Sequence, residues 1–287
     1  MTGASFAIST YLFHPHRLDR EHLVHVAAHG FGAIELFALR SHFDYGDPVA
    51  VAELAEWLDD TRLELAAVHA PIALRADATT LHDVCSIASA NAERRARAVD
   101  EIRQTLELAA VLPFRQLVVH VGVPDGDGAA GDNDTAAARR SLEQLVPMAE
   151  ARGVVLALEV MTNRLSTPDA LVELVEDVLD TPSAGVCLDV GHARLLGDPV
   201  DAIEAASGHI IAAHVHDTRG ARDEHLVPYD GSIDWSRTLL AFQKVGYSGP
   251  WTFELAPGPP TATLVKAVQA RLRFEQRLGI NDELMSQ

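Results

Sequence analysis

The sequence predicts a single (β/α)8 barrel domain that spans residues 1–287. Eight short apolar runs alternate along the chain with longer segments of helical periodicity, which is the pattern of a parallel α/β barrel. No stretch has the composition of a linker, and 287 residues of which 48% are hydrophobic suffice for one large core. A doubly wound open sheet is the rival fold. Such a sheet usually has a Gly-rich phosphate loop after its first strand, where this chain has YLFHPHR.

The eight apolar runs are the predicted strands. They are rich in Val, Ile and Leu and show little alternation of apolar and polar residues, which is typical of strands buried on both faces. In chain order they are FAIST (6–10), AIELFA (33–38), LELAAVHA (63–70), QLVVHVG (116–122), VVLALEV (154–160), GVCLDVG (185–191), IIAAHVH (210–216) and WTFEL (251–255).

Four of the segments between these strands have the features of helices. The predicted helices occupy 91–112, 134–153, 166–180 and 233–246. In the third of them Thr167 can cap the helix and Pro168 fits its first turn. Pro147 predicts a kink in the second helix, and Gly246 follows the end of the fourth.

Three long segments follow predicted strands and are expected to surround a substrate pocket. The Gly/Asp-rich segment 123–135 is predicted to be a mobile loop over the active face of the barrel. Segments 37–48 and 71–90, together with YLFHPHR, are predicted to form the pocket walls. Arg40 and Arg75 are candidate contacts for an anionic group of the substrate.

Charge and cysteine content restrict the class and location of the protein. With 23 basic and 41 acidic residues the formal net charge is −18, which disfavours binding to nucleic-acid phosphates. Cys85 and Cys187 belong to no paired motif and indicate a reducing compartment. The sequence shows neither a signal peptide nor an apolar run long enough for a membrane span. A cytoplasmic protein without a membrane partner is therefore expected.

Reactive side chains stand at the ends of the last six predicted strands. Histidines number 14 and acidic residues 41 in the chain of 287, so six successive strand ends of this kind indicate a site. The residues are His69, His120, Glu159, Asp189, His214 and Glu254. Because the carboxyl ends of barrel strands converge on one mouth, where active sites lie, these side chains are expected to meet there.

These residue types predict a divalent metal site. A buried carboxylate is costly without a partner, and several carboxylates at one mouth need a cation. Oxygen and imidazole ligands without cysteine suit Mn²⁺, Zn²⁺, Co²⁺ or Fe²⁺, whereas imidazole disfavours Mg²⁺. The predicted ligands of this ion are Glu159, Asp189, His214 and Glu254.

Three further histidines admit more than one role. His69 and His120 fit core histidines, hydrogen-bond partners of a substrate or metal ligands. His192 follows Asp189 by three positions and fits a ligand, a donor to the substrate or a helix cap.

The segment HVHDTRGARDEH, residues 214–225, is unusually dense in such side chains. His216 is expected to lie behind the ligands or in the pocket wall, and Asp217 to cap or orient the loop. Asp223 and His225 are expected to form either a second metal site or a pair that faces the substrate.

Short motifs run through nearly the whole chain in a specific order. They are IELF, VHAP, VVHVG, LALEV, CLDVGH, HVHD with DEH downstream, DGSIDW and GYSGPWTFEL. In these motifs the chain resembles the xylose isomerase-like barrel superfamily. That superfamily includes sugar phosphate isomerases and epimerases, inosose isomerases and dehydratases, ketose 3-epimerases and endonuclease IV.

The resemblance implies a metal-dependent isomerase or epimerase of a sugar, keto-inositol or related polyol. The residues that match the holders of one divalent ion in such enzymes are Glu159, Asp189, His214 and Glu254. Glu159 and Glu254 also match the acid and base that move a proton through an enediolate. The substrate contacts expected here are His69, His120, His192, Arg222 and His225, with Arg219 as an alternative to Arg222. The resemblance further implies a homodimer or homotetramer.

Three other functions stay open within the same fold. The same groups could eliminate a β-substituent after enolisation, as in a dehydratase or a lyase of 3-oxo-glycosides. The chain also resembles endonuclease IV, an abasic-site endonuclease with several zinc ions, but the net charge of −18 disfavours DNA binding. A second metal site of that type would use His69, His120, His192, Asp223 and His225. An inactive scaffold barrel is disfavoured because every ligand position is intact.

Overall fold

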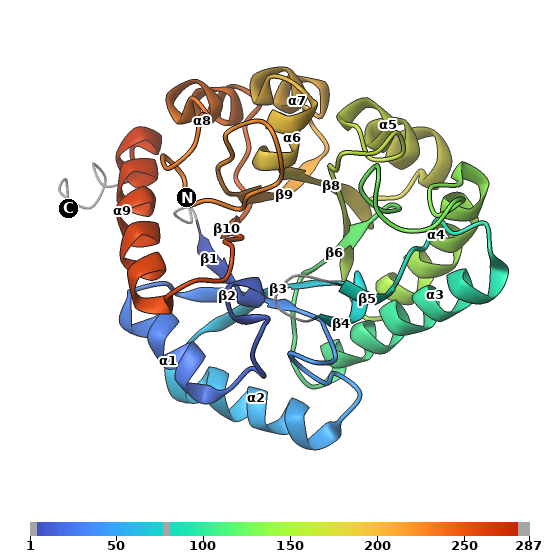
Figure 1. The fold of residues 1–287 in the computed structure, drawn as a ribbon, viewed down its shortest axis with the longest axis horizontal. Coiled ribbons are helices and arrows are strands. Elements are labelled where there is room, and N and C mark those ends of the chain that lie inside the picture. Colours follow the sequence, from blue (N-terminus) through green and yellow to red (C-terminus); the bar gives the residue numbers. More distant parts are fainter. Residues whose placement is uncertain (1–4, 77–80, 281–287) are drawn as a thin grey trace.

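The computed structural model describes residues 5–76 and 81–280 and shows a closed parallel barrel, which confirms the predicted (β/α)8 TIM-barrel fold (Figure 1). The barrel strands are β1 (Phe6–Ser9), β2 (Ala33–Phe37), β3 (Glu64–His69), β6 (Gln116–His120), β7 (Val155–Glu159), β8 (Ala184–Asp189), β9 (Ile210–Val215) and β10 (Trp251–Phe253). Neighbours pair in parallel in this order, and β1 pairs with β10 to close the ring. All eight predicted runs form barrel strands.

Helices form the outer ring of the molecule in Figure 1. They are α1 (Arg20–Ala28), α2 (Pro48–Thr61), α3 (Ala92–Glu107), α4 (Thr135–Glu150), α5 (Pro168–Glu173), α6 (Val190–Leu196), α7 (Pro199–Ala205), α8 (Trp235–Lys244) and α9 (Pro260–Leu278). Polar side chains fix where several of them begin. The side chain of Asn91 accepts hydrogen bonds from two backbone amides at the start of α3, and Thr167 accepts one from the Ala170 amide at the start of α5.

Parts of two predicted segments have another conformation. After α5 the chain continues as a π-helical turn, Leu174–Leu179, rather than as an α-helix. Segment 71–90 is not only loop, because β4 (Ala73–Ala76) and β5 (Leu81–Val84) pair in an antiparallel hairpin outside the barrel. Helix α4 continues through Pro147 to Glu150.

A small apolar cluster lies directly beneath the ends of four barrel strands. Side chains two positions apart on a strand share one face, so these residues point to the same side as the strand-end residues that follow them. The cluster consists of Val118, Ala157, Cys187 and Ala212, two positions before His120, Glu159, Asp189 and His214. The barrel interior is therefore closed under the site, and both cysteines of the chain are free.

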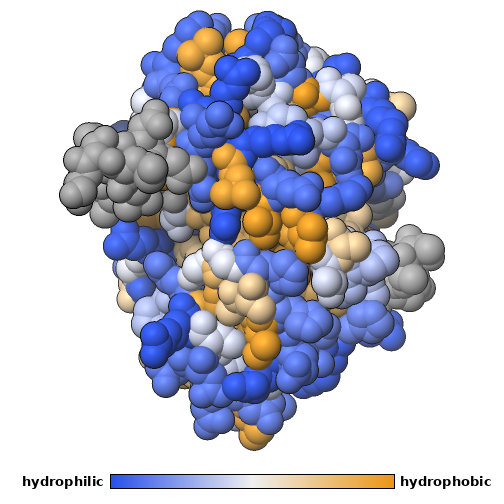
Figure 2. Space-filling model, turned by 90° about the vertical axis from the view of Figure 1, so that its left-hand side faces the viewer, coloured by the Kyte–Doolittle hydropathy of each residue, from blue (hydrophilic) through white to orange (hydrophobic). Residues whose placement is uncertain are grey.

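The face of the molecule drawn in Figure 2 is mostly hydrophilic. Figure 2 shows the side of the barrel that carries α9, where a narrow apolar band interrupts polar surroundings. Within residues 5–76 and 81–280, no helix is long and apolar enough to cross a membrane.

Candidate metal centre

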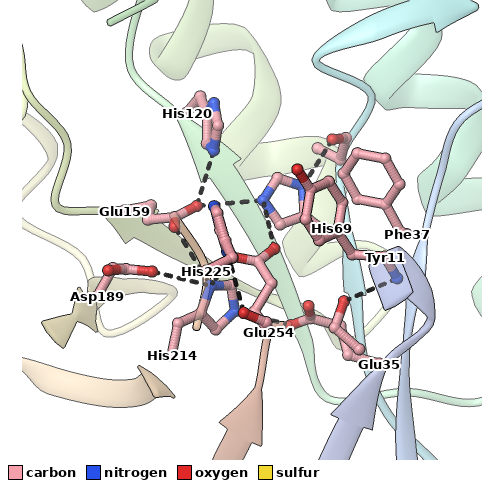
Figure 3. A network of polar contacts seen from close by, with 12 residues as sticks. Tyr11, Glu35, Phe37, His69, His120, Glu159, Asp189, His214, His225 and Glu254 are labelled. Carbon is pink, nitrogen blue, oxygen red and sulfur yellow. Dashed lines mark hydrogen bonds and ion pairs between the residues drawn. The ribbon is translucent and has the colours of Figure 1, made fainter. Parts of the chain in front are cut away.

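Parallel pairing brings five strand ends together at one mouth of the barrel. His120 is the register partner of Glu159 in the β6–β7 pair, and Asp189 is the partner of His214 in the β8–β9 pair. Glu254 directly follows β10, the next strand around the ring. Figure 3 shows these side chains, which come from separate strands, pointing toward one another.

The first group of potential ligands is formed by Glu159, Asp189, His214 and Glu254. One ligand atom of each lies within 4.8 Å of the others, and all four residues are buried. His214 is at the centre, with Nδ1 3.2 Å from a Glu159 oxygen and 3.4 Å from a Glu254 oxygen. An Asp189 oxygen lies 3.9 Å from the same nitrogen. The four residues expected to bind one ion therefore face a common point.

Glu35 is a site residue that the sequence interpretation missed. It lies on β2, is buried, and accepts a hydrogen bond from Nε2 of His214 at 3.0 Å. This contact assigns the Nε2 proton of His214 and leaves Nδ1 for the first group. The available signal was an acid inside the apolar run AIELFA. The other oxygen of Glu35 has no hydrogen-bond partner within the described part of the chain.

The second group consists of His69, His120 and Glu159. Oε2 of Glu159 lies 3.1 Å from Nε2 of His69 and 2.9 Å from Nε2 of His120. Since the other oxygen of Glu159 faces His214, this carboxylate joins the first and second groups.

The third group consists of His192, His216, Asp223 and His225. Oδ2 of Asp223 lies 3.2 Å from Nε2 of His192 and 3.0 Å from Nε2 of His225. The opposite ring nitrogens donate to the carbonyl oxygens of Val160 and Glu254, which fixes the orientation of both rings. His69, His120, His192, Asp223 and His225, the five residues expected to form a second metal site, thus divide between two separate groups.

His216 belongs to the third group and also contacts Asp189 of the first group. Its Nε2 is 3.0 Å from an Asp189 oxygen, and its ring stacks on that of His225 at a centroid distance of 4.0 Å. The ring also packs against Gly191, where a Cβ atom would collide with it. His216 therefore supports Asp189 and joins the first and third groups.

Asp217 organises the loop that carries Asp223 and His225. Its buried carboxylate accepts hydrogen bonds from the backbone amides of Tyr229 at 2.9 Å and Ile233 at 3.1 Å. It also accepts one from Nε1 of Trp235 at 2.8 Å. The aspartate thus ties the end of β9 to the start of α8, consistent with the loop-orienting role expected for it.

Charge in the centre is strongly coupled. Burial opposes ionisation of Glu159 and Glu254, but neighbouring imidazoles outweigh burial and hold the pKa of both carboxyls below the usual value. Burial likewise opposes protonation of His69 and His225, yet adjacent carboxylates raise the pKa of each to about 9. For His120 burial dominates, and its pKa is lowered.

The donor set fits a cation. Four buried carboxylates lie close together, and in residues 5–76 and 81–280 none of them pairs with a lysine or arginine. They are Glu35, Glu159, Asp189 and Glu254. In the ion-free protein only imidazolium groups balance this charge, and buried charge without a partner is costly. A divalent ion at the first group would supply the missing charge, and its oxygen and imidazole donors suit Mn²⁺, Zn²⁺ or Co²⁺.

A cavity of about 430 Å³ opens beside the centre. His69, His120, His192, Asp223, His225 and Glu254 line one side of it. Tyr11, Phe37, Ile72, Val84, Cys85, Val123, Pro124 and Met161 supply most of the rest. The walls therefore come from the three long segments and from YLFHPHR, as expected, although segment 37–48 contributes only Phe37.

The structure separates the predicted arginines from this cavity. The Arg222 side chain is 81% exposed and lies nearest Glu224, which also binds Arg219. Arg40 is held by Asp44, Glu101 and Gln104, and Arg75 by Asp83 on the hairpin. Each of these arginines has an acidic partner outside the cavity, and none of them lines the cavity.

Comparison with known proteins identifies the family. Residues 23–274 match the model of the xylose isomerase-like TIM barrel family, and the chain belongs to this family. The uncharacterized protein MJ1311 of Methanocaldococcus jannaschii is 31% identical over 261 residues, which cover 87% of this chain and 83% of that protein.

Two further relatives are named as an epimerase or as epimerase-like. The L-ribulose-5-phosphate 3-epimerase UlaE of Salmonella paratyphi A is 26% identical over 226 residues, covering 76% of this chain and 79% of UlaE. The crystal structure of a D-tagatose 3-epimerase-like protein superposes with a TM-score of 0.78 at 27% identity, covering 98% of this chain and 99% of that one.

Proposed function

We propose that this barrel is a divalent-metal-dependent isomerase or epimerase of a sugar, keto-inositol or related polyol. The observation that carries the proposal is the placement of Glu159 and Glu254 in one buried group beside a cavity. Both carboxylates are held ionised by imidazoles, so each can accept a proton at neutral pH. The similarity to sugar epimerases supports the same class of reaction.

One divalent ion, Mn²⁺, Zn²⁺ or Co²⁺ rather than Mg²⁺, would be held by Glu159, Asp189, His214 and Glu254. When bound, such an ion acts as a Lewis acid toward the carbonyl oxygen of the substrate. Glu35 keeps the His214 ring in place, and His216 supports Asp189.

The two glutamates would divide the proton transfers. One carboxylate removes the proton from the carbon next to the carbonyl, and the C–H electron pair moves into an enediolate of the substrate. The other glutamate would take a proton from the adjacent His69 imidazolium and deliver it to the opposite face of that carbon in an epimerisation, or to the adjacent carbon in an isomerisation. The proton held by the first glutamate would then pass back to the His69 imidazole and restore the starting state. Glu254 lines the cavity directly, whereas Glu159 lies against His69 and His120. Glu254 is therefore the better placed to meet the carbon.

The histidines of the cavity would bind substrate hydroxyl groups. His69, His192 and His225 each use Nδ1 on a backbone carbonyl, so Nε2 of each faces the centre. With His120 these rings line one side of the cavity. Fixed rings of this kind can position a polyol with little loss of side-chain freedom.

A nuclease with several metal ions is the second candidate, and one observation favours it. The second and third groups each gather three or four potential ligands around the first. The net charge of −18 opposes it, because phosphodiester binding normally depends on basic side chains.

The test combines metal analysis with proton exchange in deuterated water. Ketoses and keto-inositols would be incubated with the metal-loaded protein, and deuterium at the carbon next to the carbonyl would be followed by NMR. We expect exchange in the wild type and a loss of at least about 100-fold in Glu254→Gln and Glu159→Gln. Glu143→Gln, an exposed glutamate on α4, is the matched control.

Other outcomes assign the alternatives. Unchanged exchange in both site variants would contradict the proposed roles of the glutamates. Release of a substituent from a keto-glycoside after exchange would indicate a lyase or dehydratase. Cleavage of abasic DNA without exchange of any sugar would indicate the nuclease.

A further inference from the structure

The cavity has two chemically different sides. Imidazoles and carboxylates occupy the side next to the metal centre. The rest of the lining is largely apolar and includes Ile72 and Val84 from the hairpin segment, Val123 after β6 and Met161 after β7. We refer to these four residues as the apolar wall. A polyol with a hydroxyl group on every carbon does not match the apolar wall. Its hydroxyl groups would be buried there without hydrogen-bond partners, which costs free energy.

No lysine or arginine lines the cavity in the part of the chain that the structure describes, and its only basic side chains are histidines. The remaining segments, 1–4, 77–80 and 281–287, contain no Lys or Arg in their sequence. Arg94, in the neighbouring cleft, is bound to Asp132 at 2.8 Å. The features that usually recognise a phosphate or carboxylate group are therefore missing from these walls.

Acidic groups at the cavity make an anionic substituent unfavourable. Asp127, Asp223 and Glu254 all line it. A phosphate ester would bring about two more negative charges among them at neutral pH, and like charges at short range weaken binding strongly.

We infer that the substrate is an uncharged keto-sugar that carries an apolar substituent, such as an alkyl glycoside, and that the apolar wall binds this substituent. The inference rests on the proposed function, because the keto group must face Glu254 and the metal ligands. The sugar hydroxyls then meet the histidine side, and the substituent meets Val84 and Met161. A volume of about 430 Å³ suits a single sugar ring with a short substituent. UlaE is named for a phosphorylated substrate, so this chain would differ from that relative.

The experiment measures kcat/KM for deuterium exchange with four probes and the metal-loaded protein. The probes are methyl and hexyl 3-keto-β-D-glucoside, D-tagatose and D-tagatose 6-phosphate. We expect the hexyl glucoside to exceed the methyl glucoside by at least about tenfold, because added methylenes bind in an apolar pocket. We expect D-tagatose to exceed its phosphate by at least about tenfold. A phosphate ester equal to or better than the free sugar would overturn the inference.

A matched pair of variants tests the apolar wall itself. Val84→Asn changes a side chain that is 39% exposed, so the fold can tolerate it. We expect the ratio of hexyl to methyl glucoside to fall by about tenfold in this variant. Val111→Asn makes the same change at a side chain that is 57% exposed and outside the cavity, and it should leave the ratio unchanged. An unchanged ratio in Val84→Asn contradicts the assignment of the wall.

The outcome separates this inference from the proposed function. If exchange occurs but favours the phosphate or ignores the hexyl chain, the enzyme class stands and the substrate class is wrong. If no probe exchanges while the protein binds metal, the proposed isomerase function fails instead. Equilibrium binding of hexyl β-D-glucoside, which has no keto group, gives a measurement of the wall that does not depend on turnover. Binding equal to that of methyl β-D-glucoside would also overturn the inference.

Discussion

A substitution at Gly191 probes the packing around the candidate metal centre without removing any potential ligand. A Cβ atom at this position would lie 2.5 Å from Nε2 of His216 and closer still to its Cε1 and Nδ1, whereas real Cβ contacts are essentially never below 3.0 Å. The His216 ring cannot retreat freely, because it stacks on His225 and its Nε2 bonds to Asp189. Gly191→Ala should therefore displace the ring and release Asp189 from its support.

Two magnitudes follow from this geometry. Forcing a methyl group into a packed interior destabilises a protein by about 1–3 kcal/mol, which urea unfolding of the metal-free protein would measure. Loss of a residue that orients a metal ligand lowers metal affinity by about 10–100-fold, which titration calorimetry with Mn²⁺ or Zn²⁺ would measure. Gly32→Ala is the control, because a Cβ atom there meets nothing within 4 Å, and its effect should stay within about 0.5 kcal/mol.

A double variant isolates the contact with His216. In His216→Ala the ring is gone, so adding Gly191→Ala should then cost less than about 0.5 kcal/mol. Wild-type stability and metal affinity in Gly191→Ala would refute the reasoning. So would an equal loss of stability in both backgrounds, because the collision with the ring would then not be its cause.

Three further predictions concern the loop, a buried histidine and the ion. Asp217→Ala removes the acceptor of two backbone amides and one indole donor, so the free energy of unfolding measured with urea should fall by at least about 3 kcal/mol. The control is the exposed Asp230→Ala, which should lower it by under about 1 kcal/mol. Equal losses in the two variants would contradict the role of Asp217. Burial lowers the pKa of His42 from 6.5 to about 4, so the unfolded chain binds the proton first. Stability should fall as the pH drops from 6.5 to about 4, and His42→Gln should flatten this slope; an unchanged slope would exclude His42 as its source. Zn²⁺ or Mn²⁺ at about 100 times its Kd should stabilise the chelator-treated protein by roughly 2.7 kcal/mol in a thermal shift assay, and no shift would contradict the metal site.

The sequence predicted the barrel and the convergence of four potential ligands because both depend on local patterns. Runs without polar alternation indicate strands of a parallel sheet, and parallel strands place their carboxyl ends on one side. Glu159, Asp189, His214 and Glu254 could thus be expected to meet although 95 positions separate the first from the last.

The residues that the sequence interpretation missed depend on packing between distant strands. Glu35 lies in the middle of β2 rather than at a strand end, and its contact with His214 is made across the barrel mouth. The hairpin of β4 and β5 has four residues in each strand, too few for a clear alternation to be read. Both features follow from barrel closure and loop folding, which no short window of sequence contains.

Arg222 illustrates the same limit for charged side chains. The resemblance to the family implied that Arg222, or alternatively Arg219, contacts the substrate. In the structure the nearby Glu224 draws the arginines of this loop outward, while Asp223 turns inward to His192 and His225. Adjacent acids of one loop thus have opposite environments, and only the backbone path decides which of them meets the arginines.

The absence of lysine and arginine from the described cavity lining also links the proposed metal binding to the proposed substrate class. Because the buried carboxylates lack a lysine or arginine partner in the described chain, positive charge at this mouth comes from imidazolium groups and, under the proposed function, from a bound ion. An ion shared among several carboxylates still leaves surplus negative charge from Asp127 and Asp223 at the cavity. The carboxylates of such a site can accept hydrogen bonds from the hydroxyl groups of a neutral keto-sugar. Their surplus negative charge weakens the binding of anions. The same charge distribution that favours a divalent cation therefore disfavours a phosphorylated substrate.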